Sequence, residues 1–585
     1  MIEPLMATEP SLRPGAVMLI ALGAIVLIGL SKNRPNVREA WTLVAALSMF
    51  ALVASMVPDV LAGTVHETNL GTFVAGIEFT FRADRLGMIF ALVSSGLYVL
   101  TAIYSIGYMR GHDEPFQTRF FAMLAASVGA ALGVAFAANI FVLLVCYEIL
   151  TLATYPLVAH DESRESRVSG YKYLAYALSG GLAVFGGMIA VFVLAGDITF
   201  TRGGLDALAT VAAEDPWTAR LAFALLAGGF AVKAGVMPVH AWLPSAMVAP
   251  TPVSGLLHAV AVVKAGAFGV ARTVIDVFGP ETVAAIGMGV PLAILAGATI
   301  IISSLFALRQ DNLKARLAYS TIAQLSYIVL GLALLSPMAL TGALLHIPAH
   351  AFAKLTLFLC AGALYVQLGV KYISEMPGIA RRMPVTMTAF ALGSLSMAGI
   401  PILAGFVSKW HILLGGIEGG NLLVIAVLVS SGVLNVAYFW PIIYTAFFET
   451  PAGHDTKPVL LGRFGGRADA DRAVITDGGS KDEHDDHDAD HDADHDDMEP
   501  HDADDESHDD HADHADHDDH HGHGELPPPS GWEPSGGFGR ETTLLMLAPL
   551  MATTTLMIAF GTLPDHMVFF ELIEAIVAEA GEVRP

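Results

Sequence analysis

Four lysines occupy stretches of the chain that are otherwise apolar and long enough to cross a membrane: Lys233, Lys264, Lys354 and Lys409. A lysine near the centre of a spanning helix costs about 2.5–3.5 kcal/mol on insertion scales. Such residues face the protein interior or a water-filled cavity, and they mark ion or proton pathways. The chemistry that these residues predict is proton transfer at membrane depth.

The densest group lies in residues 229–268, GFAVKAGVMPVHAWLPSAMVAPTPVSGLLHAVAVVKAGAF, which also carry His240 and His258. Pro238 follows Lys233 by five residues and predicts a broken helix. A broken span is tolerated only where protein or a water-filled cavity covers the freed backbone groups. We therefore expect Lys233 to be hydrated and able to load and release a proton.

His258 and Lys264 share the next apolar run, six residues apart, and a helix turns about 100° per residue. The two side chains therefore need different partners. For His258 the alternative is a satisfied histidine in the core. Glu148 lies within NIFVLLVCYEILTLATYPLV, where a lysine from another span is its natural partner. The alternatives are a carboxylate satisfied by neighbouring hydroxyls and a permanent ion pair with Lys233.

Three titratable residues share one apolar run in LHIPAHAFAKLTLF: His346, His350 and Lys354. Spacings of i, i+4 and i+8 place them along one helix face, and Pro348 is expected to loosen that helix. A proton relay is the first interpretation, and a metal site without a nearby carboxylate is the second. Lys409 lies in SLSMAGIPILAGFVSKWHIL, whose glycines and proline predict another broken span.

The composition predicts the frame around these residues. Of the 585 residues, 54% are hydrophobic and 15% charged, and the mean hydropathy is +0.58. A soluble domain has about 25% charged residues, so we predict an all-α polytopic membrane protein that lies in a lipid bilayer. Spans of about 17–25 residues number fourteen: 14–30, 39–57, 84–107, 118–137, 139–159, 168–195, 217–237, 251–275, 281–306, 313–335, 337–366, 383–413, 420–447 and 541–562.

The two predicted broken spans occupy equivalent places if spans four to eight correspond to spans nine to thirteen. Paired interrupted spans are typical of an inverted-repeat transporter. The expected divisions are N-terminal spans in 1–110, repeat one in 115–275, repeat two in 281–447, a cytoplasmic loop in 448–540, and a last span with a C-terminal helix in 541–585. The acidic N-terminus does not match a signal peptide, so the first run should stay in the membrane.

Lys and Arg concentrate in the loops after odd-numbered spans. These loops contain thirteen such residues: Lys32, Arg34, Arg38, Arg110, Arg119, Arg164, Arg167, Arg309, Lys314, Arg316, Lys371, Arg381 and Arg382. The even-numbered loops contain five: Arg82, Arg85, Arg202, Arg220 and Arg272. By the positive-inside rule the odd loops are cytoplasmic and both termini lie outside the cell inner membrane.

The net charge of −25 comes mainly from residues 482–523, which hold 21 Asp or Glu and 12 of the 22 histidines. The rest of the chain carries about −4, and neither part suggests a nucleic-acid partner. Low hydrophobicity predicts disorder for the tract. Its histidines are weak candidates for Zn²⁺ or Ni²⁺ binding, among them His484, His487, His491 and His495. A solvated acidic loop is the alternative.

The only two cysteines are Cys146 and Cys360, each alone in an apolar run. An iron–sulfur cluster usually needs four cysteine ligands, and a structural zinc site needs a Cys/His quartet. We therefore expect no redox centre and no cofactor in this chain.

The stretch 229–268, together with YEILTLATYPLV, LKARLAYSTIAQLSY and GFVSKW, resembles the proton-antiporter family. This family comprises antiporter-like subunits of respiratory complex I, of membrane-bound hydrogenases and of Mrp-type Na⁺/H⁺ antiporters; the D-type subunit of Mrp is the most similar. The resemblance covers roughly residues 115–445. It implies fourteen spans, two inverted five-helix repeats, discontinuous helices seven and twelve, and other membrane subunits as partners.

The resemblance also implies roles for individual residues. Glu148 matches the family's acid of helix five, and Lys233 matches the lysine that pairs with it. Lys172, in YKYLAY, fits a position where the family often has a lysine. Lys264 matches the helix-eight lysine, and Lys409 matches the helix-twelve group at the proton exit. The remaining matches, His346, His350 and Lys354, fall in the family's central relay.

Three functions stay open at this stage. The first is a subunit of a monovalent cation (Na⁺)/H⁺ antiporter that moves protons along a hydrated Glu, Lys and His relay. The second is a proton-pumping subunit of a respiratory NADH dehydrogenase or a membrane-bound hydrogenase, which leaves open whether the chain serves an enzyme. The third is a metal-binding regulator that uses the His-rich loop.

Overall fold

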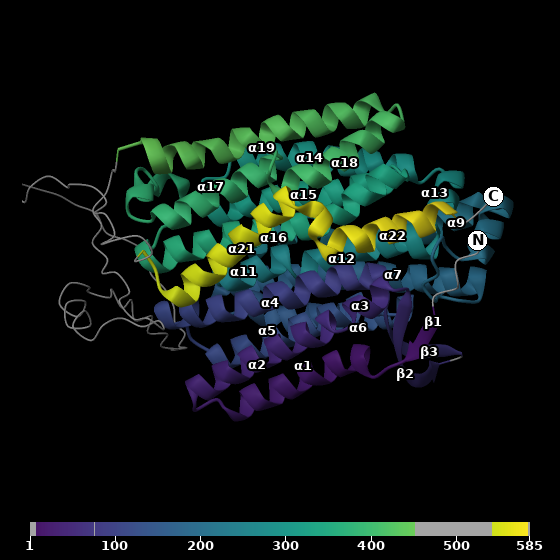
Figure 1. Cartoon of the computed structure of the whole chain (residues 1–585), viewed down its shortest axis with the longest axis horizontal. Helices are drawn as coiled ribbons and strands as arrows, with labels where there is room; N and C mark the ends of the chain where they lie inside the picture. The colour runs from purple at the N-terminus through teal and green to yellow at the C-terminus, as the bar shows by residue number, and fades with distance from the viewer. Residues whose placement is uncertain (1–6, 75, 451–540, 583–585) are drawn as a thin grey trace, which may run out of the picture.

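Long apolar helices lie side by side and make up most of the molecule, as the computed structural model shows (Figure 1). It describes residues 7–74, 76–450 and 541–582. The predicted tract 482–523, with His484, His487, His491 and His495, lies outside these residues.

Eleven helices in the described ranges are long and apolar enough to cross a membrane. The long helices of the first half are α1 (Arg13–Leu30), α2 (Pro35–Ala54), α4 (Arg85–Gly111), α5 (Gln117–Ala135), α6 (Ile140–Val158), α7 (Arg164–Ala195), α9 (Pro216–Ala234), α11 (Thr251–Ala259) and α12 (Val262–Arg272). Those of the second half are α14 (Gly289–Leu308), α15 (Leu313–Ala333), α16 (Pro337–Leu368), α17 (Pro384–Ala398), α18 (Ala404–Glu418), α19 (Leu422–Phe448), α21 (Leu544–Thr562) and α22 (Val568–Glu582).

Shorter elements join them: α3 (Val57–Leu61), α8 (Asp206–Glu214), α10 (Trp242–Ser245), α13 (Pro280–Ala285), η1 (Ala246–Val248), η2 (Thr273–Val277), η3 (Ile373–Glu375), η4 (Ile379–Arg381) and η5 (Pro564–His566). The three predicted spans outside the eleven correspond to α9, α15 and the pair α17–α18. A total of fourteen spans and their inverted repeats stay a prediction.

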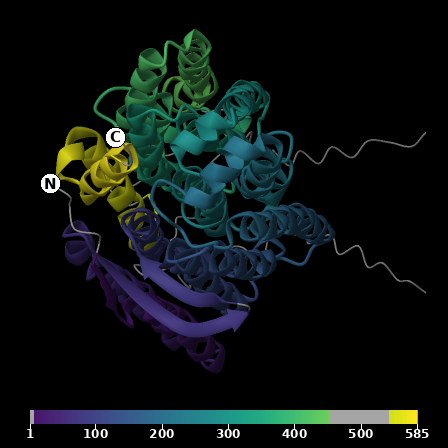
Figure 2. The ribbon, with the colours of Figure 1, turned by 90° about the vertical axis from the view of Figure 1, so that its right-hand side faces the viewer.

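A three-stranded sheet corrects the expectation of an all-α chain. It consists of β1 (Ala7–Pro10), β2 (Thr64–Val74) and β3 (Ile77–Ala83), in the order β1-β2-β3. The β1–β2 pair is parallel, and the β2–β3 pair is antiparallel with His66 opposite Ala83. Viewed from the end of the bundle, the long strands lie beside the N-terminal helices (Figure 2). The segment between α2 and α4 is thus a folded cap at the bundle end, where the sequence predicts only a connection.

Helix α16 is the centre of the second half of the bundle. It packs against α15, α17 and α18 on one part of its surface, and against α4, α11, α21 and α22 on the rest. In the most apolar 18-residue stretch of α16, 89% of the residues are buried, and in that of Thr251–Val277 all of them are. A helix that faced lipid would leave more of its residues exposed. Both segments carry charged side chains, so the frame places those charges inside protein.

The predicted interruption after Lys233 is present, since α9 ends at Ala234 and Gly235 takes a left-handed conformation with φ of 74°. Pro348 does not interrupt α16, which runs unbroken through it. Instead, an interruption that the sequence does not predict lies at Val260–Ala261, between α11 and α12.

The second predicted break lies between α17 and α18. Helix α17 ends at Ala398, and Gly399 follows with φ of 90°. At its other end, the carboxylate of Glu541 accepts hydrogen bonds from the backbone N–H groups of Val385 (3.0 Å) and Thr386 (2.7 Å). The first turn of a helix leaves such donors without helical partners, so Glu541 fixes where α17 begins.

Candidate functional site: a row of buried charges

The ammonium group of Lys233 is bound by Tyr147 of the neighbouring helix α6. Its Nζ donates a hydrogen bond to the Tyr147 carbonyl oxygen at 2.5 Å and lies 3.2 Å from the centre of the Tyr147 ring. The indole of Trp242, on α10, folds back and donates to the Val232 carbonyl at 2.9 Å. This contact satisfies one of the last carbonyls of α9 and holds the helix end that carries Lys233.

Glu148 is half-buried, directly follows Tyr147 and interacts electrostatically with Lys233. Among the described residues the two side chains form no direct ion pair within 4.0 Å. The carboxylate lies against the backbone of Gly181 on α7, where even a methyl group would collide with it. The structure therefore brings Glu148 near Lys233 without a direct bond between them, and neither carboxylate oxygen has a hydrogen-bond partner among the described residues.

Lys172 lies on α7, and its Nζ donates to the hydroxyl of Ser245 at 2.8 Å. Ser245 ends α10, the short helix that follows the interruption after Lys233. Lys172 is thus attached to the second part of the broken segment, while Lys233 ends the first part.

Lys264 connects the two halves of the row. Its Nζ donates to the carbonyl of Ile347 at 2.9 Å, so α12 is attached to α16 next to His346. His258 lies before the interruption, with its ring 4.8 Å from that of Phe358, and its nitrogens have no hydrogen-bond partner among the described residues. The two residues have different partners, but the break at Val260–Ala261 lies between them, so the spacing along one continuous helix is not the reason.

The predicted face of α16 carries His346, His350 and Lys354, all fully buried. The rings of His346 and His350 lie 5.9 Å apart. Lys354 donates to the Leu317 carbonyl at 2.9 Å and to the Ser320 hydroxyl. His350, between them, has no hydrogen-bond partner in the described part of the chain.

Lys409 ends the row, on α18, the second part of the broken segment α17–α18. It is half-buried, donates to the carbonyl of Met397, and lies 4.6 Å from the centre of the Tyr327 ring. The first part of the broken segment thus binds the ammonium group carried by the second part.

The sequence predictions omit the uncharged partners on α15. Ser320, Gln324 and Tyr327 follow each other at spacings of four and three residues, which places them on one helix face. They contact Lys354, His346 and Lys409 respectively. This spacing within LKARLAYSTIAQLSY is a signal that could have identified them.

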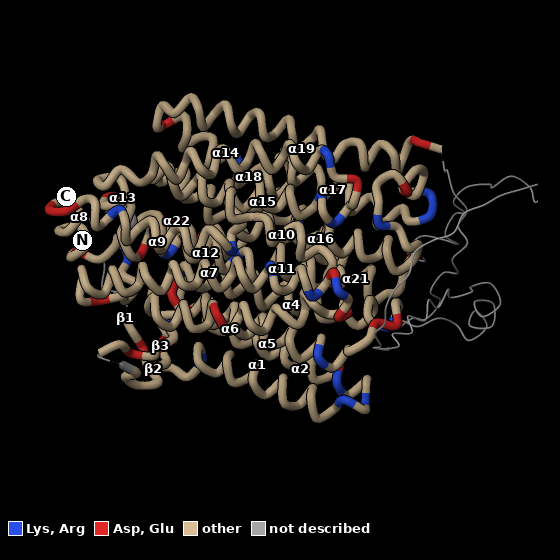
Figure 3. Tube along the Cα trace, turned by 180° about the vertical axis from the view of Figure 1, so that it is seen from behind, with Lys and Arg blue, Asp and Glu red and all other residues tan. Residues whose placement is uncertain are grey.

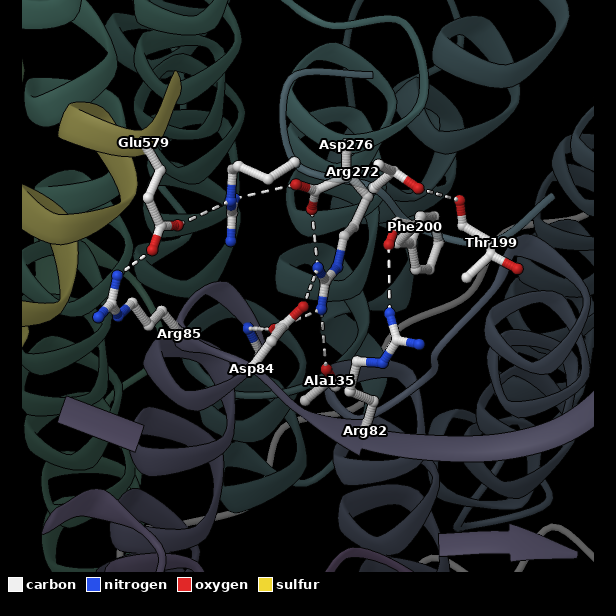
Figure 4. Close-up of polar contacts among 12 residues, drawn as sticks. Arg82, Asp84, Arg85, Ala135, Thr199, Phe200, Arg272, Asp276 and Glu579 are labelled. Carbon is white, nitrogen blue, oxygen red and sulfur yellow. Dashed lines mark hydrogen bonds and ion pairs between the residues drawn. The ribbon is translucent and has the colours of Figure 1, made fainter. Parts of the chain in front are cut away.

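A second charged cluster lies at the end of the bundle near the sheet (Figure 4). Arg272, in the last turn of α12, binds Asp84 at 2.6 Å and Asp276 at 2.7 Å. Asp276 also binds Arg202 at 2.9 Å, and Arg202 lies 3.3 Å from Glu579 of α22. Buried charges must be paired to be tolerated, and here the pairing attaches α12 to three other parts of the chain.

No group of three or more His, Cys, Asp or Glu residues that could hold a metal ion occurs within the described ranges. His346 and His350 are surrounded by uncharged groups and lysines, and nearby ammonium groups repel a metal cation. The α16 row therefore fits proton transfer better than metal binding.

The fold and the charge row define a class: a multi-pass helical membrane protein with an internal line of Lys, His and Glu side chains. The family model for the membrane part of NADH:quinone oxidoreductase and Mrp antiporters matches residues 137–435. A second model, for the N-terminus of complex I chain 5, matches residues 70–121. The chain belongs to the NADH:quinone oxidoreductase/Mrp antiporter family, and the resemblance seen in the sequence is confirmed.

Individual relatives come from both branches of the family. The N-type subunit of NADH-quinone oxidoreductase from Desulforudis audaxviator is 33% identical over 76% of this chain and 88% of its own. A probable K⁺/H⁺ antiporter protein of Rhizobium meliloti, its A/B-type subunit, is 31% identical over 74% of this chain and 43% of its own. The A-type Na⁺/H⁺ antiporter subunit of Alkalihalophilus pseudofirmus is 33% identical over 66% of this chain and 49% of its own. The chain thus spans about half the length of these antiporter subunits.

Solved structures show the same fold. A chain of the Mrp complex from Dietzia sp. DQ12-45-1b superposes with a TM-score of 0.74 at 20% identity, over 97% of this chain and 98% of that one. A chain of an archaeal membrane-bound sulfane sulfur reductase gives 0.66 at 24% identity, over 75% and 88%.

Proposed function

We propose that the chain is the proton-translocating membrane subunit of a multisubunit monovalent cation (Na⁺)/H⁺ antiporter. The observation that carries the proposal is shared by four lysines. Each ammonium group donates to a backbone carbonyl of another helix: Lys233 to Tyr147, Lys264 to Ile347, Lys354 to Leu317 and Lys409 to Met397. No lysine in the described residues has a carboxylate within 4.0 Å.

A carbonyl partner suits a group that must gain and lose a proton. An ammonium and a neutral amine both carry N–H donors, so either form of the lysine keeps its hydrogen bond. A carboxylate partner would instead hold the charged form, and removing that charge would leave a buried anion unpaired. These contacts therefore support loading and release by each lysine.

Coupling along the row follows from electrostatics. Two charges 4 Å apart interact by about 4 kcal/mol at an effective dielectric near 20. Protonation of one group therefore disfavours protonation of the next. In the proposed cycle, a change in the interaction between Glu148 and Lys233 alters the charge state of Lys264. The change then passes to the His346–His350–Lys354 face and on to Lys409.

The proposal includes the predicted organisation. The repeats are 115–275 and 281–447, the spans number fourteen, and the chain lies in the cell inner membrane with its termini outside and residues 448–540 cytoplasmic. Other membrane subunits are its partners, since the relatives are named as subunits and the solved chains belong to multisubunit complexes.

The second candidate is a proton-pumping subunit of a respiratory NADH dehydrogenase or a membrane-bound hydrogenase. The NADH-quinone oxidoreductase relative favours it, since the match extends over 88% of that protein. In that case redox chemistry in partner subunits would drive the same charge row.

Proton flux into vesicles that contain the whole complex tests the proposal. Lys354→Met should lower flux by about 100-fold or more, in line with the loss of a proton-transfer group. Lys371→Met, at an exposed lysine after α16, is the control and should keep the flux. Near-normal flux in an assembled Lys354→Met complex would overturn the relay. Flux that follows a Na⁺ or K⁺ pulse indicates the antiporter, and flux that requires NADH or H₂ oxidation indicates the second candidate.

A further inference from the structure

The side chain of Gln324 bridges His346 and the broken segment that carries Lys409. Its Nε2 lies 3.4 Å from the Met397 carbonyl oxygen and 3.4 Å from Asn435 Oδ1, and its Oε1 lies 3.1 Å from His346 Nε2. All of these side chains are buried. Their hydrogen-bonding roles can therefore be deduced from donor and acceptor chemistry.

The orientation of the Gln324 amide follows from the Met397 carbonyl. A backbone carbonyl oxygen can only accept, so the amide group that faces it must be NH₂. The amide oxygen of Gln324 then faces His346, and an amide oxygen also can only accept. Consequently His346 Nε2 must carry a hydrogen.

The other ring nitrogen faces a group that can change roles. His346 Nδ1 lies 2.7 Å from the hydroxyl of Ser408, and this hydroxyl also lies 3.3 Å from the Gly405 carbonyl oxygen. When His346 is neutral, the Ser408 hydroxyl donates to Nδ1. When Nδ1 carries a proton, it donates to the Ser408 oxygen, and the hydroxyl turns to the Gly405 carbonyl.

We infer that Gln324 is a positioning residue that fixes the Nε2–H tautomer of His346, so that the transported proton binds and leaves only at Nδ1, on the side of Ser408 and the broken segment. The bond that forms is Nδ1–H, and the ring becomes an imidazolium that keeps its Nε2–H. On release, Nδ1 regains its lone pair and the Ser408 hydroxyl turns back. The inference deepens the proposed function and rests on it.

The bridge leaves His346 a single site for proton exchange. The hydrogen bond made by one ring nitrogen of a histidine determines which nitrogen exchanges protons. Besides Gln324 and Ser408, the groups that face His346 are His350, the Tyr327 ring at 5.5 Å, and the ammonium groups of Lys264 and Lys409. With Nε2 occupied, a proton cannot pass through the amide and enters or leaves by the Ser408 side.

The test combines ¹⁵N NMR of histidine-labelled complex in lipid at alkaline pH with proton flux in vesicles. A difference spectrum against His346→Asn assigns the His346 signals. The wild-type complex should show the Nε2–H tautomer. Gln324→Met removes the acceptor at similar size, so the ring should shift toward Nδ1–H, bonded to Ser408, and flux should fall at least about tenfold. Gln310→Met, two residues after the end of α14, is the control and should change neither the tautomer nor the flux.

Ser408→Ala should keep the Nε2–H tautomer but lower the flux. Ser326→Ala should leave the flux unchanged, because among the described residues the Ser326 hydroxyl donates only within its own helix, to the Ile322 carbonyl at 3.0 Å. A wild-type Nδ1–H or doubly protonated ring, or an Nε2–H ring in Gln324→Met, overturns the inference. Normal flux in assembled His346→Asn overturns the relay itself, whatever the spectra show, so the two failures are distinguishable.

Discussion

The absence of a side chain at Gly181 determines where the carboxylate of Glu148 can lie. The side chain of Glu148 packs directly on the α7 backbone at this residue, and a Cβ there would lie 2.8 Å from the Glu148 Cδ and still closer to Oε1. The carboxylate is therefore held near Lys233 by the absence of a side chain opposite it. A position of this kind is sensitive to a single methyl group.

Gly181→Ala should reduce proton flux by about tenfold, because displacing a charged group within the row changes interactions worth a few kcal/mol. Gly186→Ala is the matched control on the same helix, where the nearest atom to a new Cβ is Leu225 Cδ1 at 3.9 Å. Flux in vesicles, normalised to assembled complex, provides the measurement. Equal flux in the two variants would show that the position of Glu148 does not matter for transport.

At the scale of single residues, the charged members of the row could be predicted, but their partners could not. A lysine in an apolar run stands out because its cost in a membrane is large. A backbone carbonyl occurs at every residue, so nothing in the sequence marks Tyr147, Ile347, Leu317 or Met397 as the acceptors. The close approach of Glu148 to Gly181 depends in the same way on how α6 and α7 pack.

At the scale of elements, proline and glycine explain which helix breaks could be predicted. The breaks after Lys233 and between α17 and α18 follow from prolines and glycines nearby in the sequence. The break at Val260–Ala261 lies among residues 259–262, Ala-Val-Ala-Val, with neither residue type present. Pro348 lies inside an unbroken α16 because the surrounding helices hold it. Tertiary packing therefore decides both exceptions.

The contact between Arg272 and Asp84 fixes the C-terminal end of α12, the helix that carries Lys264. Burial alone would raise the pKa of Asp84, but the guanidinium of Arg272 and its hydrogen bonds hold that pKa below its usual value. The stabilisation is therefore present above the unfolded-state pKa of about 3.9 and is lost as the pH falls through the lower, folded-state pKa. The other charges that face Asp84 are Arg202, Asp276 and Glu579.

Asp84→Asn should lower the apparent unfolding temperature at neutral pH, since breaking a buried ion pair costs about 3–5 kcal/mol. In the variant, the unfolding temperature should also fall less steeply than in the wild type as the pH drops below about 4. Thermal unfolding of the complex in detergent, followed by tryptophan fluorescence between pH 3 and 7, measures both effects. Glu162→Gln is the control, because its pair with Arg119 is 32–50% exposed and such pairs contribute little. A similar loss in both variants would contradict the anchoring role of Asp84.

At the scale of the whole molecule, ion pairs compensate most of the arginine charge at the sheet end of the bundle. The difference in positive charge between the two ends is therefore larger than a count of residues suggests. The predicted outer loops contain five arginines, and four of them bind carboxylates: Arg82 to Glu67, Arg85 to Glu579, Arg202 to Asp276 and Arg272 to Asp84. Arg220 donates instead to the Ile286 carbonyl. The first strand and the last helix lie at this same end of the bundle (Figure 1). Lysines and arginines gather at the other end, as around the start of α2 (Figure 3).

The positive-inside rule then predicts that the sheet end faces away from the cytoplasm, and the two native cysteines allow a clean test. Cys146 and Cys360 are buried, so labels on introduced cysteines have little background. A membrane-impermeant maleimide should label Glu281→Cys, near the sheet end, in intact cells. It should label Lys371→Cys only after the cells are opened. The reverse pattern would invert the orientation, and labelling of both from outside would mean that an even number of crossings separates residues 281 and 371.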